Sequence, residues 1–168
     1  MILTTRAFAG FVLTLSAGVL GAALLSQYWG GLAPCELCLI ERWPWDAAIV
    51  VALVALFAGS RPALPWTALV VALVFAASAT AAFYHVGVEQ HWFRGPSACT
   101  AGAAGAATLE ELKRQIFATQ PVLCDEVQWS LFGVSLAGWN LLASIVMAGL
   151  SLVVWARTRR PASREATA

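Results

Sequence analysis

Charged residues are scarce in this chain. Of its 168 residues, 10 are Lys or Arg and 9 are Asp or Glu, so 11% are charged while 60% are hydrophobic. Soluble domains have about 25% charged and about 45–50% apolar residues, which argues against a water-soluble globular domain. Intrinsic disorder is excluded because it needs low hydrophobicity and high net charge. A net charge of +1 also provides no basic field for nucleic acid.

Signatures of common cofactors are missing as well. The chain has no Gly-x-Gly-x-x-Gly, the fingerprint of dinucleotide binding. No His directly follows Cys38, so c-type haem attachment is not indicated. What the chain does contain is a set of long apolar runs, four cysteines and eight tryptophans.

Four apolar runs approach the ~20 residues that a helix needs to cross a bilayer. They predict an all-α membrane protein, a four-helix transmembrane bundle in a single domain over 1–168. The predicted spans are about 7–29, 40–57, 63–84 and 131–155, with outward loops at about 30–39 and 85–130. A cleaved signal peptide is the alternative for the first run, but that run exceeds the usual h-region of about 7–15 residues, so we expect a retained span.

The second span is interrupted by a proline. Pro44 inside a helix would remove a hydrogen bond and clash with the preceding turn. We therefore expect the helix to begin just after Cys38, which places Pro44 in the first turn, where amides have no intrahelical partner.

Basic residues predict the direction of the chain through the membrane. Six lie on the side of the termini and the short turn: Arg6, Arg61, Arg157, Arg159, Arg160 and Arg164. Four are spread over the longer opposite segments: Arg42, Arg94, Lys113 and Arg114. Because basic residues accumulate on the cytoplasmic side, both termini should be cytoplasmic. Tryptophans near the span ends fit interfacial anchors: Trp29, Trp43, Trp66, Trp129 and Trp155.

This topology places all four cysteines on the outward face, which is an oxidising compartment in a bacterial inner membrane. Cys35 and Cys38 form a Cys-x-x-Cys pair, an arrangement typical of redox activity. Cys99 and Cys124 form the other natural pair, beside a Gly/Ala-rich segment at 101–107 that we expect to be flexible. An exposed disulfide in a flexible loop suits thiol exchange.

A short amphipathic helix is predicted after that segment, over 108–117. Thr108 and Glu111 fit a capping box, and apolar residues share one face. This helix would lie in the membrane interface, and a surface helix packed on protein is the alternative.

The start of the second span carries the candidate chemistry. The positive end of a helix favours a Cys38 thiolate. Arg42 is four residues later, on the same helical face, and can donate to a carbonyl oxygen of a ligand. Asp46 is a possible partner of Arg42, while a snorkelling interfacial Arg is the alternative role. His85 ends the third span on the same side and can move protons near neutral pH.

Taken together, these motifs resemble the DsbB family of bacterial inner-membrane disulfide-forming quinone reductases. The resemblance rests on the strings Pro34-Cys-Glu-Leu-Cys38, Glu41-Arg42 and Tyr84-His85, and on Cys124 followed by acidic residues, an aromatic and Gly-Val-Ser-Leu. It covers nearly the whole chain.

The resemblance implies a protein-dithiol:quinone oxidoreductase. Cys99–Cys124 would exchange with a soluble DsbA-like thiol oxidase, with Cys99 forming the mixed disulfide. Electrons would pass to Cys35–Cys38, and Cys38 would contact a membrane quinone, either ubiquinone or menaquinone. Arg42 would hold the quinone with His85 nearby, and no metal is expected.

Three other interpretations compete. Four thiolates could form a zinc site, although the 24 residues between Cys99 and Cys124 do not match the usual close pairs. Two inert disulfides in a membrane scaffold are a second possibility, although such short rings brace poorly. A protein like vitamin K epoxide reductase is the third, but its Cys-x-x-Cys normally lies late in the chain.

Overall fold

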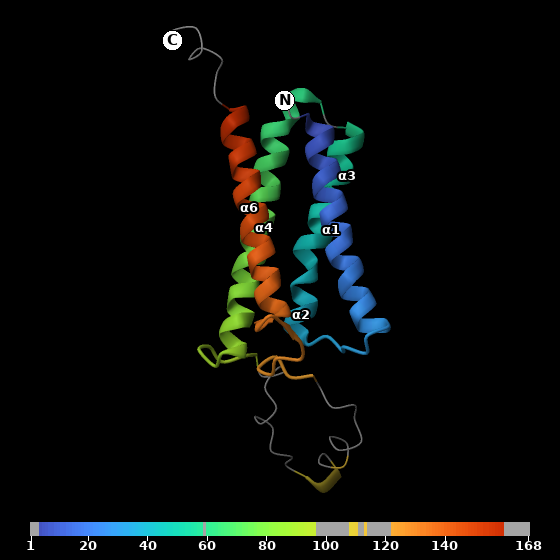
Figure 1. Cartoon of the computed structure of the whole chain (residues 1–168), viewed down its shortest axis with the longest axis vertical. Coiled ribbons are helices and arrows are strands. Elements are labelled where there is room, and N and C mark those ends of the chain that lie inside the picture. The colour runs from blue at the N-terminus through green and yellow to red at the C-terminus, as the bar shows by residue number, and fades with distance from the viewer. Residues whose placement is uncertain (1–3, 59, 97–107, 111–112, 114–121, 160–168) are drawn as a thin grey trace.

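The computed structural model describes residues 4–58, 60–96, 108–110, 113 and 122–159. Four helices run side by side (Figure 1): α1 (Thr5–Tyr28), α3 (Arg42–Ala58), α4 (Leu64–Glu89) and α6 (Leu136–Thr158). The shorter elements are helix α2 (Glu36–Ile40), the 3-10 turn η1 (Arg61–Ala63) and the strands β1 (Ser130–Leu131) and β2 (Val134–Ser135). The protein is therefore mainly helical, as the sequence predicts.

Three helices are long and apolar enough to cross a membrane: α1, α4 and α6, with 24, 26 and 23 residues. α3 has 17 residues and is shorter than the ~20 residues of a typical span. It nevertheless packs along α1 and α4. Within the described residues, the multi-span membrane character is supported, while the crossing by α3 stays a prediction.

The two ends of the bundle differ (Figure 1). The start of α1, the turn between α3 and α4 and the end of α6 lie at one end, and α2 lies at the other. Arg159 stacks over Trp66 and Trp155 at the first end, with its guanidinium carbon 4.9 and 5.2 Å from the ring centroids. Arg159 is thus in contact with two of the tryptophans that lie near the ends of the predicted spans.

The second predicted helix begins earlier than expected and is broken. α2 begins at Glu36, with Cys35 as its N-cap, and a turn at Glu41 separates it from α3. The prediction of a start just after Cys38 was therefore wrong by about one helical turn. The break has a local cause, because Pro44 has no amide hydrogen to donate to the carbonyl of Ile40, four residues earlier.

The last helix begins later than the predicted span. Residues 130–135 form a hairpin in which Ser130 pairs with Ser135 and Leu131 with Val134. Phe132 and Gly133 have φ of 52° and 78°, a left-handed pair typical of a tight hairpin turn. Ser135 then caps α6 by accepting from the amide of Gly138 at 3.0 Å. The tight turn and this cap together move the helix start from the predicted 131 to 136.

Small side chains let α4 and α6 pack closely. Ala72, Ala82 and Ala137 are buried, and the Ser144 hydroxyl donates to the Ser78 hydroxyl at 2.9 Å between these helices. Small residues and short hydroxyl bonds are the usual means of helix association in lipid, where apolar burial gives little driving force. α4 and α6 are therefore closely packed against each other.

Two sequence predictions lie mostly outside the described residues. These are Cys99 with its Gly/Ala-rich neighbour segment, and most of the helix expected over 108–117.

Candidate functional site

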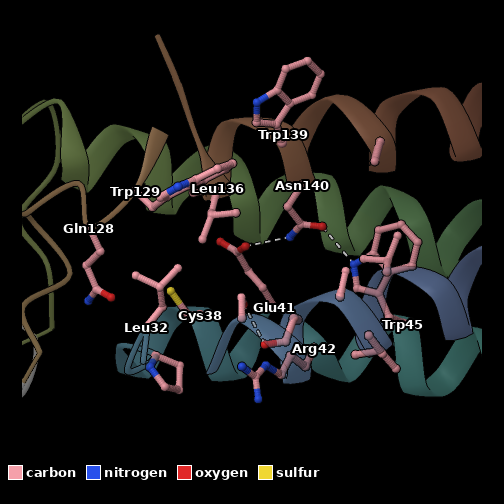
Figure 2. A pocket seen from close by; sticks show the side chains of 18 of the residues that line it. Leu32, Cys38, Glu41, Arg42, Trp45, Gln128, Trp129, Leu136, Trp139 and Asn140 are labelled. Carbon is pink, nitrogen blue, oxygen red and sulfur yellow. Dashed lines mark hydrogen bonds between the residues drawn. The ribbon is translucent and has the colours of Figure 1, made fainter. Parts of the chain in front are cut away.

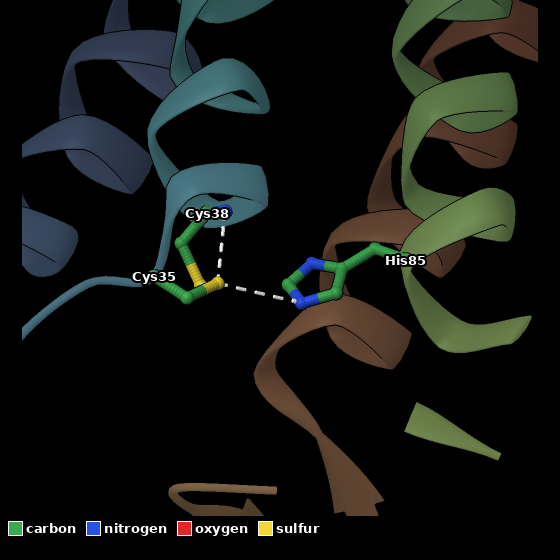
Figure 3. A group of neighbouring side chains, drawn as sticks. All are labelled: Cys35, Cys38 and His85. Carbon is green, nitrogen blue, oxygen red and sulfur yellow. Dashed lines mark hydrogen bonds between the residues drawn. The ribbon is translucent and has the colours of Figure 1, made fainter. Parts of the chain in front are cut away.

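The Cys-x-x-Cys pair lies at the start of α2. The Cys35 sulfur caps this helix by accepting from the Cys38 amide at 3.2 Å. The Cys35 thiol donates to the Cys38 sulfur, with the two sulfurs 2.9 Å apart. Cys35 is buried, whereas Cys38 is partly exposed. The structure thus brings the predicted pair together and gives its two members different surroundings (Figure 3).

This asymmetry makes Cys38 the more acidic thiol. The hydrogen bond to the Cys38 sulfur, together with burial, raises the pKa of Cys35 to about 12. The same hydrogen bond, received from Cys35, lowers the pKa of Cys38. A thiolate is the reactive form of cysteine. The surroundings therefore favour the thiolate at Cys38 and the protonated thiol at Cys35.

His85 reaches the pair from α4. Its Nε2 lies 3.6 Å from the Cys35 sulfur, and its Nδ1 lies 2.7 Å from the Glu41 carboxylate, with both side chains buried. His85 does not end its helix, since α4 continues for another turn to Glu89. The sequence predicts His85 on the same side of the membrane as the thiols, and it gives Glu41 no role beyond its place in the Glu41-Arg42 string.

Two further residues missed by sequence reasoning continue this contact. The Asn140 amide of α6 donates to Glu41 Oε2 at 2.6 Å, and Asn140 Oδ1 accepts from the Trp45 indole at 2.8 Å (Figure 2). Asn140 is the only amide side chain in the long apolar α6, and Glu41 is an ionisable residue at the start of an apolar run. Polar groups at such positions are functional candidates, which is the signal that could have identified both.

A cavity of about 530 Å³ adjoins these residues. Most of its lining is apolar, and its polar members include Cys38, Glu41, Arg42 and Asn140. Figure 2 shows the Cys38 sulfur and the Glu41 carboxylate among the lining side chains. A mostly apolar pocket with a few convergent polar groups is the usual form of a small-molecule site.

Arg42 lines the same cavity, as the helical spacing from Cys38 predicted. Its Nη1 donates to Gln27 Oε1 of α1 at 2.8 Å. Among the described side chains, Asp46 forms no ion pair with Arg42, so the suggested Arg42–Asp46 pair is not found. Gln27 takes that place because α1 lies beside α3 at this depth.

Cys124 belongs to the same buried cluster. It packs with Cys35, Leu37 and Val88, and Cys38 lies against the group. One cysteine of the predicted outer pair is therefore next to the inner pair. Its predicted partner Cys99 lies outside the described residues.

The donor atoms of Cys35, Cys38 and His85 all lie within 4.8 Å of one another, close enough to suggest a metal site. Two thiolates on one zinc ion, each about 2.3 Å from the metal, would stand roughly 3.8 Å apart in tetrahedral geometry. The sulfurs here are 2.9 Å apart. This separation is shorter than the one that two thiolates on a zinc ion would have.

Comparison with known proteins gives a consistent answer. The sequence model described as "Disulfide bond formation protein DsbB" matches residues 5–154. The chain is 30% identical to disulfide bond formation protein B of Verminephrobacter eiseniae, over 98% of this chain and 94% of that protein. It is 28% identical to the protein of the same name from Aromatoleum aromaticum, over 93% and 95%, and 29% identical to that of Marinobacter nauticus, over 95% and 96%.

No solved structure matches significantly. The family match nevertheless covers the cysteine pair, Arg42, His85, Cys124 and all four of the long helices, apart from the end of α6. The chain therefore belongs to the DsbB family of disulfide bond formation proteins.

Proposed function

We propose that this protein reoxidises a DsbA-like thiol oxidase and passes the electrons to a membrane quinone. Membership of the family supports disulfide bond formation and a disulfide oxidoreductase activity. The observation that carries the finer proposal is the place of Cys38. Its low-pKa sulfur faces the mostly apolar cavity and also lies beside Cys35.

The outer cysteine pair receives the electrons first in this proposal. Cys99 forms the mixed disulfide with the partner, and Cys124 is released as a thiol. The second cysteine of the partner then attacks the mixed disulfide, so that the partner leaves oxidised and Cys99 and Cys124 are both reduced. The reduced outer pair then reduces the Cys35–Cys38 disulfide by thiol–disulfide exchange. The packing of Cys124 against Cys35 supports this order, because exchange needs sulfurs that can approach directly.

The residues around the cavity fit a quinone. The apolar lining suits a lipid-soluble ring, and Arg42 offers donors to a carbonyl oxygen. A quinone, when bound, accepts two electrons and two protons. Cys38 supplies the reacting sulfur, Arg42 orients the acceptor, and His85 takes up the Cys35 proton as the disulfide forms again. Ubiquinone and menaquinone both satisfy these requirements.

The placement in the membrane completes the proposal. α1, α3, α4 and α6 all cross the bacterial inner membrane, with both termini cytoplasmic and the cysteines on the periplasmic side. The grouping of α2 at the end opposite the start of α1 supports this arrangement.

A coupled assay tests the function. Membranes containing the protein are mixed with a reduced thioredoxin-like partner, and partner oxidation and quinone reduction are followed together. We expect both to proceed at equal molar rates, and replacement of Cys35, Cys38, Cys99 or Cys124 by Ser to stop net turnover. Wild-type rates in the Cys38→Ser protein would refute the assigned relay.

A further inference from the structure

A continuous line of polar contacts joins the thiol pair to the cavity. It begins at the Cys35 sulfur and passes through His85 to Glu41, and from Glu41 through Asn140 to Trp45. Its members come from α2, the α2–α3 turn, α4, α6 and α3. Glu41, Asn140 and Trp45 line the cavity. The line therefore connects a reacting sulfur with the space next to Cys38.

Trp45 determines which way the Asn140 amide faces. An indole nitrogen can only donate, so the atom of Asn140 that meets it must be the carbonyl oxygen. Trp45 is itself held in place, because it is buried and packs edge-on against Phe75 with ring centroids 4.9 Å apart. The amide NH2 of Asn140 is consequently directed at Glu41.

This orientation assigns the two oxygens of Glu41. Oε2 accepts from Asn140 at 2.6 Å, which leaves Oε1, 2.7 Å from His85 Nδ1, as the oxygen that meets the imidazole. Rotation of the carboxyl group away from His85 would break the bond to Asn140. A neutral His85 that donates from Nδ1 to Glu41 has its Nε2 lone pair 3.6 Å from the Cys35 sulfur, whose single S–H can turn to it from the Cys38 sulfur.

Few other charges act on Glu41. Glu89 of α4 and the Cys38 and Cys124 thiols are near enough to interact electrostatically with this group of residues. Arg42, the next residue in the chain, is turned to Gln27 of α1. α6 contributes the neutral Asn140. His85 is thus the only basic side chain bonded to Glu41 among the described residues.

We propose that Asn140, oriented by Trp45, is a positioning residue that holds Glu41 to receive the proton that His85 takes from Cys35. The inference rests on the proposed function and deepens it. Cys38 first loses its proton as the more acidic thiol. When the Cys35–Cys38 disulfide then forms, the Cys35 S–H bond breaks, one S–S bond forms, and two electrons pass to the quinone. The Cys35 proton goes to His85 Nε2, and the Nδ1 proton goes to Glu41 Oε1, beside the cavity; this proton and the one that Cys38 released balance the two protons that the quinol takes up.

The test measures thiol deprotonation without a quinone. In a Cys38→Ala background, the labelling rate of Cys35 by methyl methanethiosulfonate is measured against pH, with the Cys35 peptide quantified by mass spectrometry. We expect Asn140→Leu to slow labelling near neutral pH by about tenfold or more, the scale of one hydrogen bond to a charged group, and to move the profile to higher pH. Asn140→Gln should restore part of the rate, because it keeps an amide donor.

Trp45→Phe provides a second variant if Asn140→Leu does not fold. It keeps an aromatic ring beside Phe75 and removes the indole N–H together with part of the ring system, so the profile should move in the same direction by less. Ser144→Ala is the matched control, because it removes a different hydrogen bond of α6, the one to Ser78 of α4 away from the thiols, and it should leave the profile unchanged.

The failures of the two proposals are distinguishable. A Cys35 profile that is unchanged in both Asn140→Leu and Trp45→Phe, or that moves equally in Ser144→Ala, would overturn the positioning role. A wild-type protein that forms no quinol would instead overturn the proposed function. With Cys38 restored, Asn140→Leu should slow quinol formation at saturating quinone and leave half-saturation unchanged. A change confined to half-saturation would show that Asn140 binds the acceptor rather than positions Glu41.

Discussion

At the scale of single residues, the two cysteines of one motif have different tasks. Cys35 is buried, caps α2 and donates to its neighbour, while Cys38 faces the cavity and receives that hydrogen bond. The positive end of the helix and the hydrogen bond both favour negative charge on this pair. The two cysteines differ because the Cys35 sulfur is the hydrogen-bond donor and the Cys38 sulfur faces the cavity.

Replacing Cys35 tests this asymmetry. Cys35→Ala removes the donor that lowers the pKa of Cys38, so the thiolate should form at higher pH than in the reduced wild-type protein. The shift should be about one to two pH units, because a hydrogen bond to a charged group contributes about 1.5–3 kcal/mol and one pKa unit corresponds to about 1.4 kcal/mol. The measurement is the rate of Cys38 alkylation by iodoacetamide against pH.

The matched control for this experiment is Ser144→Ala, whose Cys38 profile should follow that of the wild type. An unchanged profile in Cys35→Ala would mean that the helix end alone determines the acidity of Cys38.

The sequence points to the candidate reactive residues but not to the residues that contact them. Cys35, Cys38, Arg42 and His85 were predicted from motif and spacing, and the structure brings them together. Glu41 and Asn140 are 99 positions apart, and no local sequence pattern predicts that their side chains are in contact. Their contact depends on the turn at Glu41 and on the packing of α6, both of which are properties of the folded chain.

At the scale of elements, helix ends are where sequence and structure differ most. The lack of charge in the apolar runs predicted the helices themselves, because burial or lipid is required for such runs. Their boundaries depend on individual hydrogen bonds of the backbone. Pro44 has no amide hydrogen to donate, Ser135 caps α6, and the Phe132-Gly133 turn closes the hairpin before it. The hydrophobic pattern of a sequence does not indicate where these hydrogen bonds form.

The end of α4 offers a test of element packing. Trp92 and Phe93 donate through their amides to the Gly87 carbonyl at 2.8 and 3.1 Å, and the Phe93 ring stacks on Tyr84 with centroids 5.9 Å apart. A Cβ at Gly87 would collide with the Phe93 ring. Gly87→Ala should therefore destabilise the protein by about 1–3 kcal/mol, measured by thermal unfolding in detergent.

Two variants make this result specific. Gly149→Ala in α6 meets nothing within 4 Å and should leave stability near the wild-type value. Phe93→Ala combined with Gly87→Ala should cost less than the two single changes together, because the collision is removed. Equal losses in Gly87→Ala and Gly149→Ala would show that the contact with Phe93 is not what matters.

At the scale of the whole molecule, the proposed function depends on which end of the bundle faces outward. The start of α1, the α3–α4 turn and the end of α6 share one end, and the Cys-x-x-Cys motif lies at the other. Basic residues near the first end favour the cytoplasm, and the reactive cysteines then face the oxidising side. The cysteines lie on that side only if α3 crosses the membrane together with the three longer helices.

Labelling of introduced cysteines tests the topology. In a background where all four native cysteines are Ala, Trp92→Cys should react with a membrane-impermeant maleimide in spheroplasts. Ser60→Cys, in the α3–α4 turn, should react only after the membrane is permeabilised. Labelling of Ser60→Cys without labelling of Trp92→Cys in intact spheroplasts would reverse the orientation of α4, and labelling of both positions would mean that α4 does not cross the membrane.

In the proposed reaction, the Cys35–Cys38 dithiol reduces a quinone directly. The most direct measurement mixes purified, fully reduced protein carrying Cys99→Ala and Cys124→Ala with a short-chain ubiquinone, without any partner, and follows quinol formation in a single turnover. We predict quinol equimolar with the Cys35–Cys38 disulfide formed, and none from the same protein with Cys38→Ser. Absence of quinol from the intact pair, or an equal yield after Cys38→Ser, would contradict the account.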